Sequence, residues 1–272
     1  MSKVKFDKIG YWSEIKLDII KEYAQAYSQI LSTKNLKHIY IDAFAGAGQH
    51  ISKKTGEFIP GSPLNALNVQ PPFDEYHLID LNPHKVAELE KIKGEKNDIF
   101  VYQGDCNQKL MKEVFPRVRY EDYKRGLCLL DPYGLHLNWE VIETAGKMKS
   151  IEIFLNFPVA DMNRNALWKN PKGVDEDDIK RMTAYWGDET WKNTAYTDDL
   201  FGNPQKEINR VVADGFRERL KKKAEFKYVS EPLPMRNSNR AIIYYLFFAS
   251  QQQVADKIIK DIFSKYKDKG LK

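Results

Sequence analysis

The chain has 272 residues, enough for one large α/β domain or for a domain with a smaller subdomain. Its 42% of hydrophobic residues can supply a core, and its net charge of +5 is compatible with a nucleic-acid partner without being diagnostic of one. The two cysteines, Cys106 and Cys128, form no C-x-x-C pair and have no histidine at ligand spacing. This argues against zinc, iron–sulfur and disulfide-stapled classes, and predicts no metal site.

The ends of the chain and its apolar runs bear on targeting. Residues 1–8 contain no apolar signal core, and no run approaches the roughly 18 apolar residues that span a bilayer. The longest apolar run, residues 241–249, has the length of a strand. We therefore expect a cytoplasmic protein.

The first predicted elements are a helix and a strand. Apolar residues recur at helical spacing over residues 14–31, with Ser13 as the expected N-cap. A short apolar run, residues 37–42, follows and predicts a buried strand. A helix that leads directly into this strand would pack on the sheet and form one wall of a pocket.

The strand 37–42 leads into a glycine-rich turn. It ends in Asp42 and is followed by Phe44, Gly46 and Gly48. Glycines at this spacing let the backbone approach a ligand closely. The run Asp-x-Phe-x-Gly-x-Gly resembles the first motif of methyltransferases that use S-adenosylmethionine (SAM). Taken alone, it fits a tight strand-to-helix turn without a ligand equally well.

The segment after the turn is polar and rich in turn residues. Residues 49–61 predict a loop that is longer than usual, and so a candidate flap over the ligand. Ser62 and Pro63 then have the order of an N-cap and a first helical residue, which predicts a helix over residues 63–69.

The alternation of strand and helix continues along the chain. Four further strands are predicted, at residues 76–80, 99–102, 126–130 and 151–155, and helical segments follow the first three. This repeat predicts an α/β protein with a mostly parallel sheet and helices on both faces. Acidic or polar residues follow each strand, at the edge where open α/β sheets bind ligands.

The rhythm changes over residues 160–225, where three of the five tryptophans lie. We predict a helical insertion here, with helices at 179–185 and 207–220. It would either add cover to the core or recognise a substrate or partner. Residues 1–159 and 226–272 would form the main domain.

The last part of the chain completes the predicted sheet. Residues 226–229 and 241–248 predict an antiparallel pair of strands, and residues 251–266 predict a terminal helix. The expected fold is a Rossmann-like class I methyltransferase fold, with a mostly parallel seven-stranded sheet and an antiparallel last strand.

The order of acids along the chain matches the chemistry of SAM. Gly46 and Gly48 would admit the methionine end, and Asp42 would bind its ammonium group. Asp80, after the second strand, would accept both ribose hydroxyls, and Asp105, after the third, the adenine amino group. Phe44 belongs to the same predicted site. Each acid also has a structural alternative: Asp80 and Asp105 as helix caps, and Asp42 as a brace for the loop.

Asp131, Pro132 and Tyr133 follow the fourth strand and are the predicted catalytic residues. The run resembles the Asp/Asn-Pro-Pro-Tyr motif of amino-methyltransferases, in which acceptors hold an amino group and the aromatic ring stacks on a base. Here the second proline is missing, because Gly134 follows Tyr133. The alternative is a turn after a central strand, with Asp131 as a cap.

Several segments together resemble the three-Cys-motif partner family. They are residues 40–48, 61–63, 76–80, 104–107, 130–135, 239–240 and 244–250. The resemblance implies a methyltransferase-like fold and a partner, a radical-SAM-type protein that carries the three cysteines. It implies no particular substrate or catalytic residue.

Three functions remain open at this point. The first is a SAM-dependent methyltransferase whose acceptor the sequence leaves open, with nucleic acid as one candidate, and the second is a non-catalytic partner of the three-cysteine protein. The third, a nicotinamide-dependent oxidoreductase, fits less well because the third glycine of Gly-x-Gly-x-x-Gly is absent after Gly48.

Overall fold

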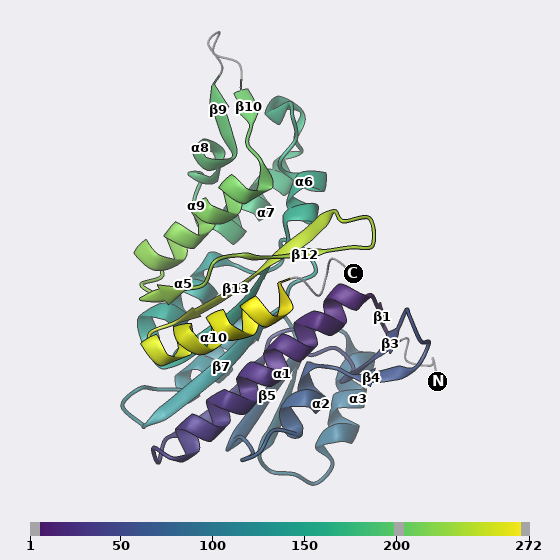
Figure 1. The fold of residues 1–272 in the computed structure, drawn as a ribbon, viewed down its shortest axis with the longest axis vertical. Helices are drawn as coiled ribbons and strands as arrows, with labels where there is room; N and C mark the ends of the chain where they lie inside the picture. Colours follow the sequence, from purple (N-terminus) through teal and green to yellow (C-terminus); the bar gives the residue numbers. More distant parts are fainter. Residues whose placement is uncertain (1–5, 199–203, 268–272) are drawn as a thin grey trace.

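The computed structural model describes residues 6–198 and 204–267. One large sheet forms the middle of the molecule (Figure 1). Its strands are β2 (Lys37–Asp42), β5 (Glu75–Asp80), β6 (Ile99–Gln103), β7 (Lys124–Leu130), β8 (Ile151–Phe157), β11 (Tyr228–Val229), β12 (Leu233–Arg236) and β13 (Ile242–Ser250).

The strand order is β11-β13-β8-β7-β2-β5-β6, with β12 also paired to β13. The five strands from β8 to β6 are parallel, and β13 runs antiparallel to β8. The chain begins in the middle of the sheet, moves outward through β5 and β6, and returns to the other side of β2 at β7. This is the class I methyltransferase arrangement, as predicted, and its switch point lies between β2 and β7.

The edge of the sheet beyond β13 differs in detail from the seven strands expected. The strand predicted at 226–229 is the short β11, and a further strand, β12, forms in the predicted connection. Both pair with the same edge of β13, which gives eight strand segments. Pro234 lies within β12 and lacks an N–H group, which an edge strand tolerates because no outer neighbour needs the donor.

Helices cover both faces of the sheet. They include α1 (Tyr11–Ser32), α2 (Ser62–Leu67), α3 (Pro83–Lys93), α4 (Cys106–Lys109), α5 (Trp139–Met148) and α10 (Gln253–Tyr266). Helices α1 and α10 lie side by side and share one core with α2 and α3 (Figure 1). The other core contains α4, α5 and the turns η1 (Leu110–Val114) and η2 (Phe115–Arg117) that continue α4.

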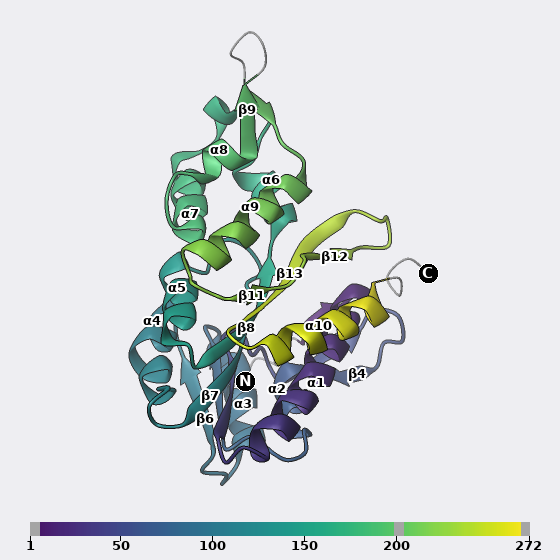
Figure 2. The ribbon, with the colours of Figure 1, turned by 60° about the vertical axis from the view of Figure 1, so that its left-hand side comes forward.

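The segment after β8 lies at one end of the molecule, in the upper part of Figures 1 and 2. Its elements are α6 (Val159–Asn165), η3 (Pro171–Gly173), α7 (Glu176–Trp186), α8 (Trp191–Ala195), β9 (Tyr196–Asp198), β10 (Pro204–Lys206) and α9 (Asn209–Lys222). Helices α7 and α9 match the two that the sequence predicts. Phe157 of β8 packs against Tyr185 and Phe216 of this segment, so the two parts share one core.

A second, smaller sheet replaces the predicted loop at 49–61. Strands β3 (Gln49–Ser52) and β4 (Phe58–Pro60) form a hairpin, and β1 (Lys8–Ile9) adds to it in parallel. The Ser52 hydroxyl donates to Glu14 of α1 at 2.7 Å and anchors the hairpin. The expectation of an irregular flap is therefore wrong: the hairpin is paired and braced, and it brings the N-terminal strand close to the ligand-binding edge.

Within the described ranges, no helix combines the length and apolar character needed to cross a membrane.

Candidate functional site

The glycine loop that follows β2 has the backbone that only glycine adopts without strain. Gly46 and Gly48 have φ angles of +65° and +79°. A Cβ atom on Gly48 would also lie 2.3 Å from Cδ1 of Ile92 on α3. The loop is tied to its neighbouring strands, since Ala43 N donates to Leu129 of β7 and Ala45 N donates to Ile79 of β5. It therefore lies at the switch point.

Asp42 lies beneath this loop and is fully buried. Its Oδ1 accepts from Phe44 N at 3.2 Å, and its Oδ2 accepts from the Tyr40 hydroxyl at 3.2 Å. Burial raises its pKa to about 6, and the nearby Asp131 adds to the shift, although a hydrogen bond from Ser62 opposes it. The structure places Asp42 as a brace for the loop rather than on the surface of a cleft. Ser62, expected as a helix N-cap, instead directs its side chain to Asp42.

The two acids that follow β5 and β6 lie at the same edge. Asp80 accepts from Gly46 N through Oδ2 at 2.9 Å and from Asn82 N through Oδ1 at 2.8 Å. Asp105 caps α4 by accepting from Gln108 N at 3.1 Å. Each oxygen of Asp80 accepts one bond here, and a carboxylate has about four lone-pair sites. Asp80 can therefore accept two further hydrogen bonds from a ligand.

A cleft of about 260 Å³ opens beside these acids. Four of the predicted site residues line it: Phe44, Asp80, Asp105 and Tyr133. The other lining residues are Ala43, Leu81, Lys85, Gly104, Cys106 and His136. Asp42, Gly46, Gly48, Asp131 and Pro132 stand around it and do not line it. Phe44 and the exposed Leu81 supply apolar surface between acceptors, which suits a ligand with a flat ring and hydroxyl groups.

Asp131 is engaged in an ion pair that the sequence analysis did not foresee. Its Oδ2 accepts from the Nζ of Lys16 on α1, and only 9% of the Lys16 side chain is exposed. Burial would lower the pKa of Lys16, but the charge and hydrogen bond of Asp131, together with Tyr244 and Asp42, raise that pKa above its usual value. A signal was present in the sequence, because Lys16 falls four residues before Ile20 and seven before Tyr23, on the apolar face of α1.

Tyr133 lies at the mouth of the cleft, with 74% of its surface exposed. Its hydroxyl donates to Oδ2 of Asp7 at 3.0 Å, and Lys85 donates to the same oxygen at 2.6 Å. The Lys85 ammonium also lies 5.6 Å from the centre of the Tyr133 ring. The contacts of Asp7 and Lys85 with Tyr133 could not be predicted from the sequence. Asp7 directly precedes β1 and Lys85 lies on α3, and both meet Tyr133 only in the folded chain.

The backbone of the Asp-Pro-Tyr-Gly run is held from two sides. The carbonyl oxygen of Pro132 accepts from Nδ2 of Asn156 at the end of β8, at 3.2 Å. Leu135 N donates to Oδ2 of Asp161 at 3.2 Å. A Cβ atom at Gly134 would lie 2.5 Å from that carboxylate oxygen. Glycine at this position thus follows from the close approach of Asp161.

His50, on β3, is a further residue of the site to which the sequence analysis gave no role. Its Nδ1 is shielded from solvent and has no hydrogen-bond partner among the described residues. Burial lowers its pKa, so the imidazole is neutral at neutral pH. Four charged side chains act on it electrostatically: Asp7, Lys16, Lys85 and Asp131. The neutral ring therefore lies within electrostatic reach of both the cleft mouth and the Asp131–Lys16 pair.

The thiol of Cys106 lines the cleft but is not activated. Burial raises the pKa of the Cys106 thiol to about 12, and the adjacent Asp105 adds to the shift, so a thiolate is not available. Across residues 6–198 and 204–267, no group of three or more His, Cys, Asp or Glu side chains could hold a metal ion.

A comparison with solved structures found several of similar architecture, one of them with a TM-score above 0.5. A Legionella pneumophila protein of the DUF519 family aligns with a TM-score of 0.56 and 16% identity, over 93% of this chain and 91% of that one. A putative methyltransferase from Escherichia coli gives a TM-score of 0.35 and 12% identity, over 85% and 86% of the two chains. A putative methyltransferase from Thermobifida fusca gives a TM-score of 0.42 and 9% identity, over 88% of this chain and 82% of that one.

No protein-family model and no curated protein matches the sequence. At 16% identity, the similarity to the Legionella pneumophila protein concerns the fold alone. The strand order of the sheet is that of the class I methyltransferase fold. The chain thus has a methyltransferase-like fold with a lined cleft at the switch point of its sheet.

Proposed function

We propose that this protein is a SAM-dependent methyltransferase and that its acceptor is an amino group in nucleic acid. One observation carries the proposal: Phe44, Asp80, Asp105 and Tyr133, which come from four different segments, line a single cleft at the switch point. The net charge of +5 and the resemblance of Asp131-Pro132-Tyr133 to the amino-methyltransferase motif support the nucleic-acid acceptor.

The chain's own groups fit SAM in kind and order. Asp80 keeps acceptor capacity for two ribose hydroxyls while it holds Gly46 N. Asp105 offers a carboxylate for the adenine amino group, beside the apolar surfaces of Phe44 and Leu81. Removing Asp80 would cost about 1.5–3 kcal/mol for a hydrogen bond to a charged group, or about ten- to a hundredfold in affinity.

SAM, when bound, supplies a methyl group on a positively charged sulfur. An amino nitrogen that receives this methyl must lose one proton. The Pro132 carbonyl, held in place by Asn156, is a fixed acceptor for an amino hydrogen. The neutral imidazole of His50, within electrostatic reach of Asp7 and Lys85 at the cleft mouth, is the acceptor for the released proton. The exposed ring of Tyr133 offers a face on which an extruded base stacks.

A second candidate keeps the fold without the reaction. The chain would then belong to the three-Cys-motif partner family in the strict sense, as a cytoplasmic, non-catalytic partner of a radical-SAM-type protein with three cysteines. The ion pair of Asp131 with Lys16 favours this alternative, because it directs the carboxylate away from the lined cleft.

Transfer of a labelled methyl group from SAM to RNA or DNA by the purified chain tests the two against each other. The methyltransferase should label one nucleic acid, and Asp80→Ala should lose most of this activity. Asp261→Asn, an exposed acid on α10, is the matched control and should keep it. A folded chain that labels neither, and that co-purifies with a three-cysteine protein encoded beside it, would favour the alternative.

A further inference from the structure

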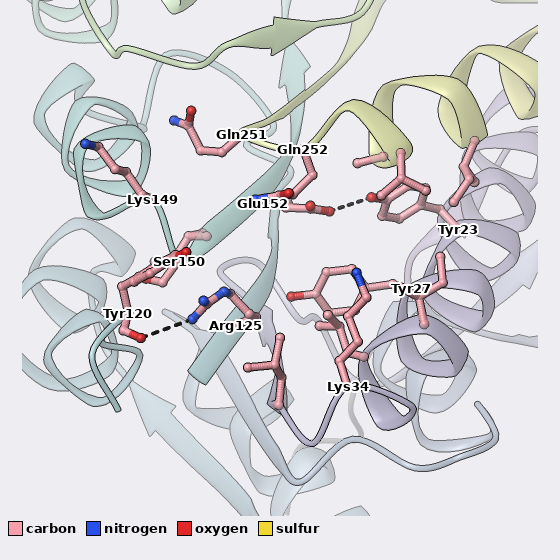
Figure 3. Close-up of a pocket in the computed structure, with 17 residues that line it drawn as sticks. Tyr23, Tyr27, Lys34, Tyr120, Arg125, Lys149, Ser150, Glu152, Gln251 and Gln252 are labelled. Atoms are coloured by element: carbon pink, nitrogen blue, oxygen red, sulfur yellow. Dashed lines mark hydrogen bonds between the residues drawn. The ribbon is translucent and has the colours of Figure 1, made fainter. Parts of the chain in front are cut away.

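A second cavity, drawn in Figure 3, lies at the amino ends of the parallel strands, whereas the cleft lies at their carboxyl ends. Arg125 and Glu152 line it from the amino ends of β7 and β8, and Gln251 lines it from just after β13. The cavity holds about 210 Å³. Because the SAM cleft lies at the carboxyl ends of the parallel strands, the two spaces share no lining residue.

The interior of this cavity contains a hydroxyl group with no partner. Tyr27 of α1 is 6% exposed, and its Oη has no hydrogen-bond partner among the described residues. The neighbouring Tyr23 differs, since its hydroxyl donates to Glu152. Glu152 also accepts from the Ser250 hydroxyl at 2.8 Å. A buried hydroxyl without a partner costs free energy, and a ligand that bonds to it would recover that cost.

Positively charged residues outnumber acidic ones in the lining of the cavity. Arg125, Lys34 and Lys149 all line it, and none forms an ion pair with a described residue. Arg125 instead donates to the Tyr120 and Lys124 carbonyl oxygens at 3.2 and 2.7 Å, and its guanidinium lies 3.7 Å from the centre of the Tyr120 ring. The lining thus contains three cations and one carboxylate, Glu152, so the cavity favours a ligand with a negative group.

The remaining walls are apolar and accept a flat body. They are formed by Ile30, Leu31, Leu36, Ile151, Ala255 and Ile258. Figure 3 shows Tyr27 and Arg125 on opposite sides of the cavity, with Glu152 near its upper end. An anionic group can thus meet Arg125 and the Tyr27 hydroxyl while a ring occupies the apolar space and a donor on the ring reaches Glu152.

We propose that this cavity is a second ligand site, which binds a compact aromatic acid: one ring, one carboxylate and one hydroxyl or amino group. The volume of about 210 Å³ and the few polar groups around it suit a compact ligand with one ring. The site is independent of the methyl-transfer reaction and stands whether or not that reaction is confirmed.

The test measures the binding of three probes to the full chain by calorimetry and by saturation-transfer NMR. 4-Hydroxybenzoate has the proposed chemistry, 4-hydroxybenzamide is its uncharged counterpart, and inorganic phosphate is an anion without a ring. We expect 4-hydroxybenzoate to bind saturably and about tenfold or more tightly than the amide. Arg125→Gln should remove this preference, and Arg119→Gln, a matched change at an exposed arginine outside the cavity, should keep it.

Tyr27→Phe separates ligand binding from a structural role. It removes only a hydroxyl that has no partner in the free protein, so the melting temperature of the free protein should stay the same or rise. The same variant should bind 4-hydroxybenzoate several-fold more weakly. A loss of stability without a loss of binding would contradict the assignment.

Three results would overturn the proposal. They are no saturable binding of 4-hydroxybenzoate at millimolar concentration, equal affinities for the acid and the amide, and an affinity for inorganic phosphate as high as that for 4-hydroxybenzoate. A SAM titration on the same preparations keeps the two sites apart, because Arg125→Gln should leave SAM binding unchanged. Failure of SAM to bind, with normal 4-hydroxybenzoate binding, would count against the methyltransferase and not against this site.

Discussion

Asp131 and Lys16 form an ion pair that joins the carboxyl end of β7 to the buried face of α1. The Lys16 ammonium also lies 5.2 Å from the centre of the Tyr244 ring on β13, so three elements meet at one charge. The carboxylate of the predicted catalytic run is therefore fixed and neutralised by a residue about 115 positions away. Its first role is to hold the strand-end turn against α1.

Lys16→Met should destabilise the protein, because it leaves the Asp131 carboxylate without its partner. Breaking a buried pair costs about 3–5 kcal/mol, and the cost here should lie near the low end because the Asp131 side chain is 26% exposed. Urea unfolding of both proteins measures the difference. The double variant Lys16→Met with Asp131→Asn should recover much of the loss, and no recovery would show that Lys16 acts through packing alone.

His50→Gln should lower methyl transfer while leaving SAM affinity unchanged, because His50 takes up a proton and holds no part of SAM. General base catalysis contributes about 10²–10⁴-fold, so a loss of at least a hundredfold in kcat is expected. The pH profile is the deciding readout: its acidic limb should belong to His50, whose pKa burial lowers, and should disappear in the variant. An unchanged profile would remove His50 from the reaction.

Tyr133→Phe and Tyr133→Ala should differ in their effect on the nucleic-acid acceptor. The phenylalanine variant loses only the hydrogen bond to Asp7, and keeps the exposed ring. The alanine variant loses stacking worth about 1–3 kcal/mol, or about five- to a hundredfold in kcat/KM for the acceptor. Equal loss in the two variants would indicate that the hydroxyl, not the ring, is what matters.

Glu152 should make the protein less stable as the pH rises. Burial raises its pKa from 4.5 to about 7, and hydrogen bonds from Tyr23 and Ser250 oppose the shift. Between these values the folded protein holds the proton more tightly than the unfolded chain, so folding stability falls as pH increases from 4.5 to 7. The difference amounts to about 3 kcal/mol.

Glu152→Gln should remove this contribution. The change in unfolding free energy between pH 5 and pH 8 should then be smaller in the variant than in the original protein. The two changes should differ by about 3 kcal/mol. Glu121→Gln, at an exposed acid whose pKa is lowered by its own backbone N–H and by Arg119, is the control and should leave the dependence between pH 5 and pH 8 as it was. An identical pH dependence in all three proteins would contradict the raised pKa of Glu152.

The parts of the fold that were predictable depend on local pattern. Apolar runs that end in an acid gave β2 and β5 with their ends at Asp42 and Asp80, and the repeat of strand and helix gave the parallel order. The hairpin of β3 and β4 was missed because its strands are short and separated by polar turn residues, and its pairing depends on β1, which is distant in the sequence. Strand β12 was missed because proline in a strand argues against one.

The candidate site divides in the same way. The residues at strand ends, Asp80 and Asp105, were predictable because the carboxyl ends of parallel strands meet at one edge. Asp7 and Lys85 reach the site from the N-terminal segment and from α3, and their contact depends on tertiary packing that no spacing records. The spacing of Lys16 on α1 marks it as buried but does not name Asp131 as its partner. The buried Nδ1 of His50 likewise becomes visible only once the hairpin is folded.

Isothermal titration of SAM into the original chain and into Asp80→Ala tests the central claim most directly. We predict saturable binding by the original chain and an affinity about ten- to a hundredfold weaker in the variant, with both proteins folded and Asp261→Asn unchanged. Absence of SAM binding to the folded original chain at millimolar concentration, or equal affinity in Asp80→Ala, would contradict the assignment of the cleft.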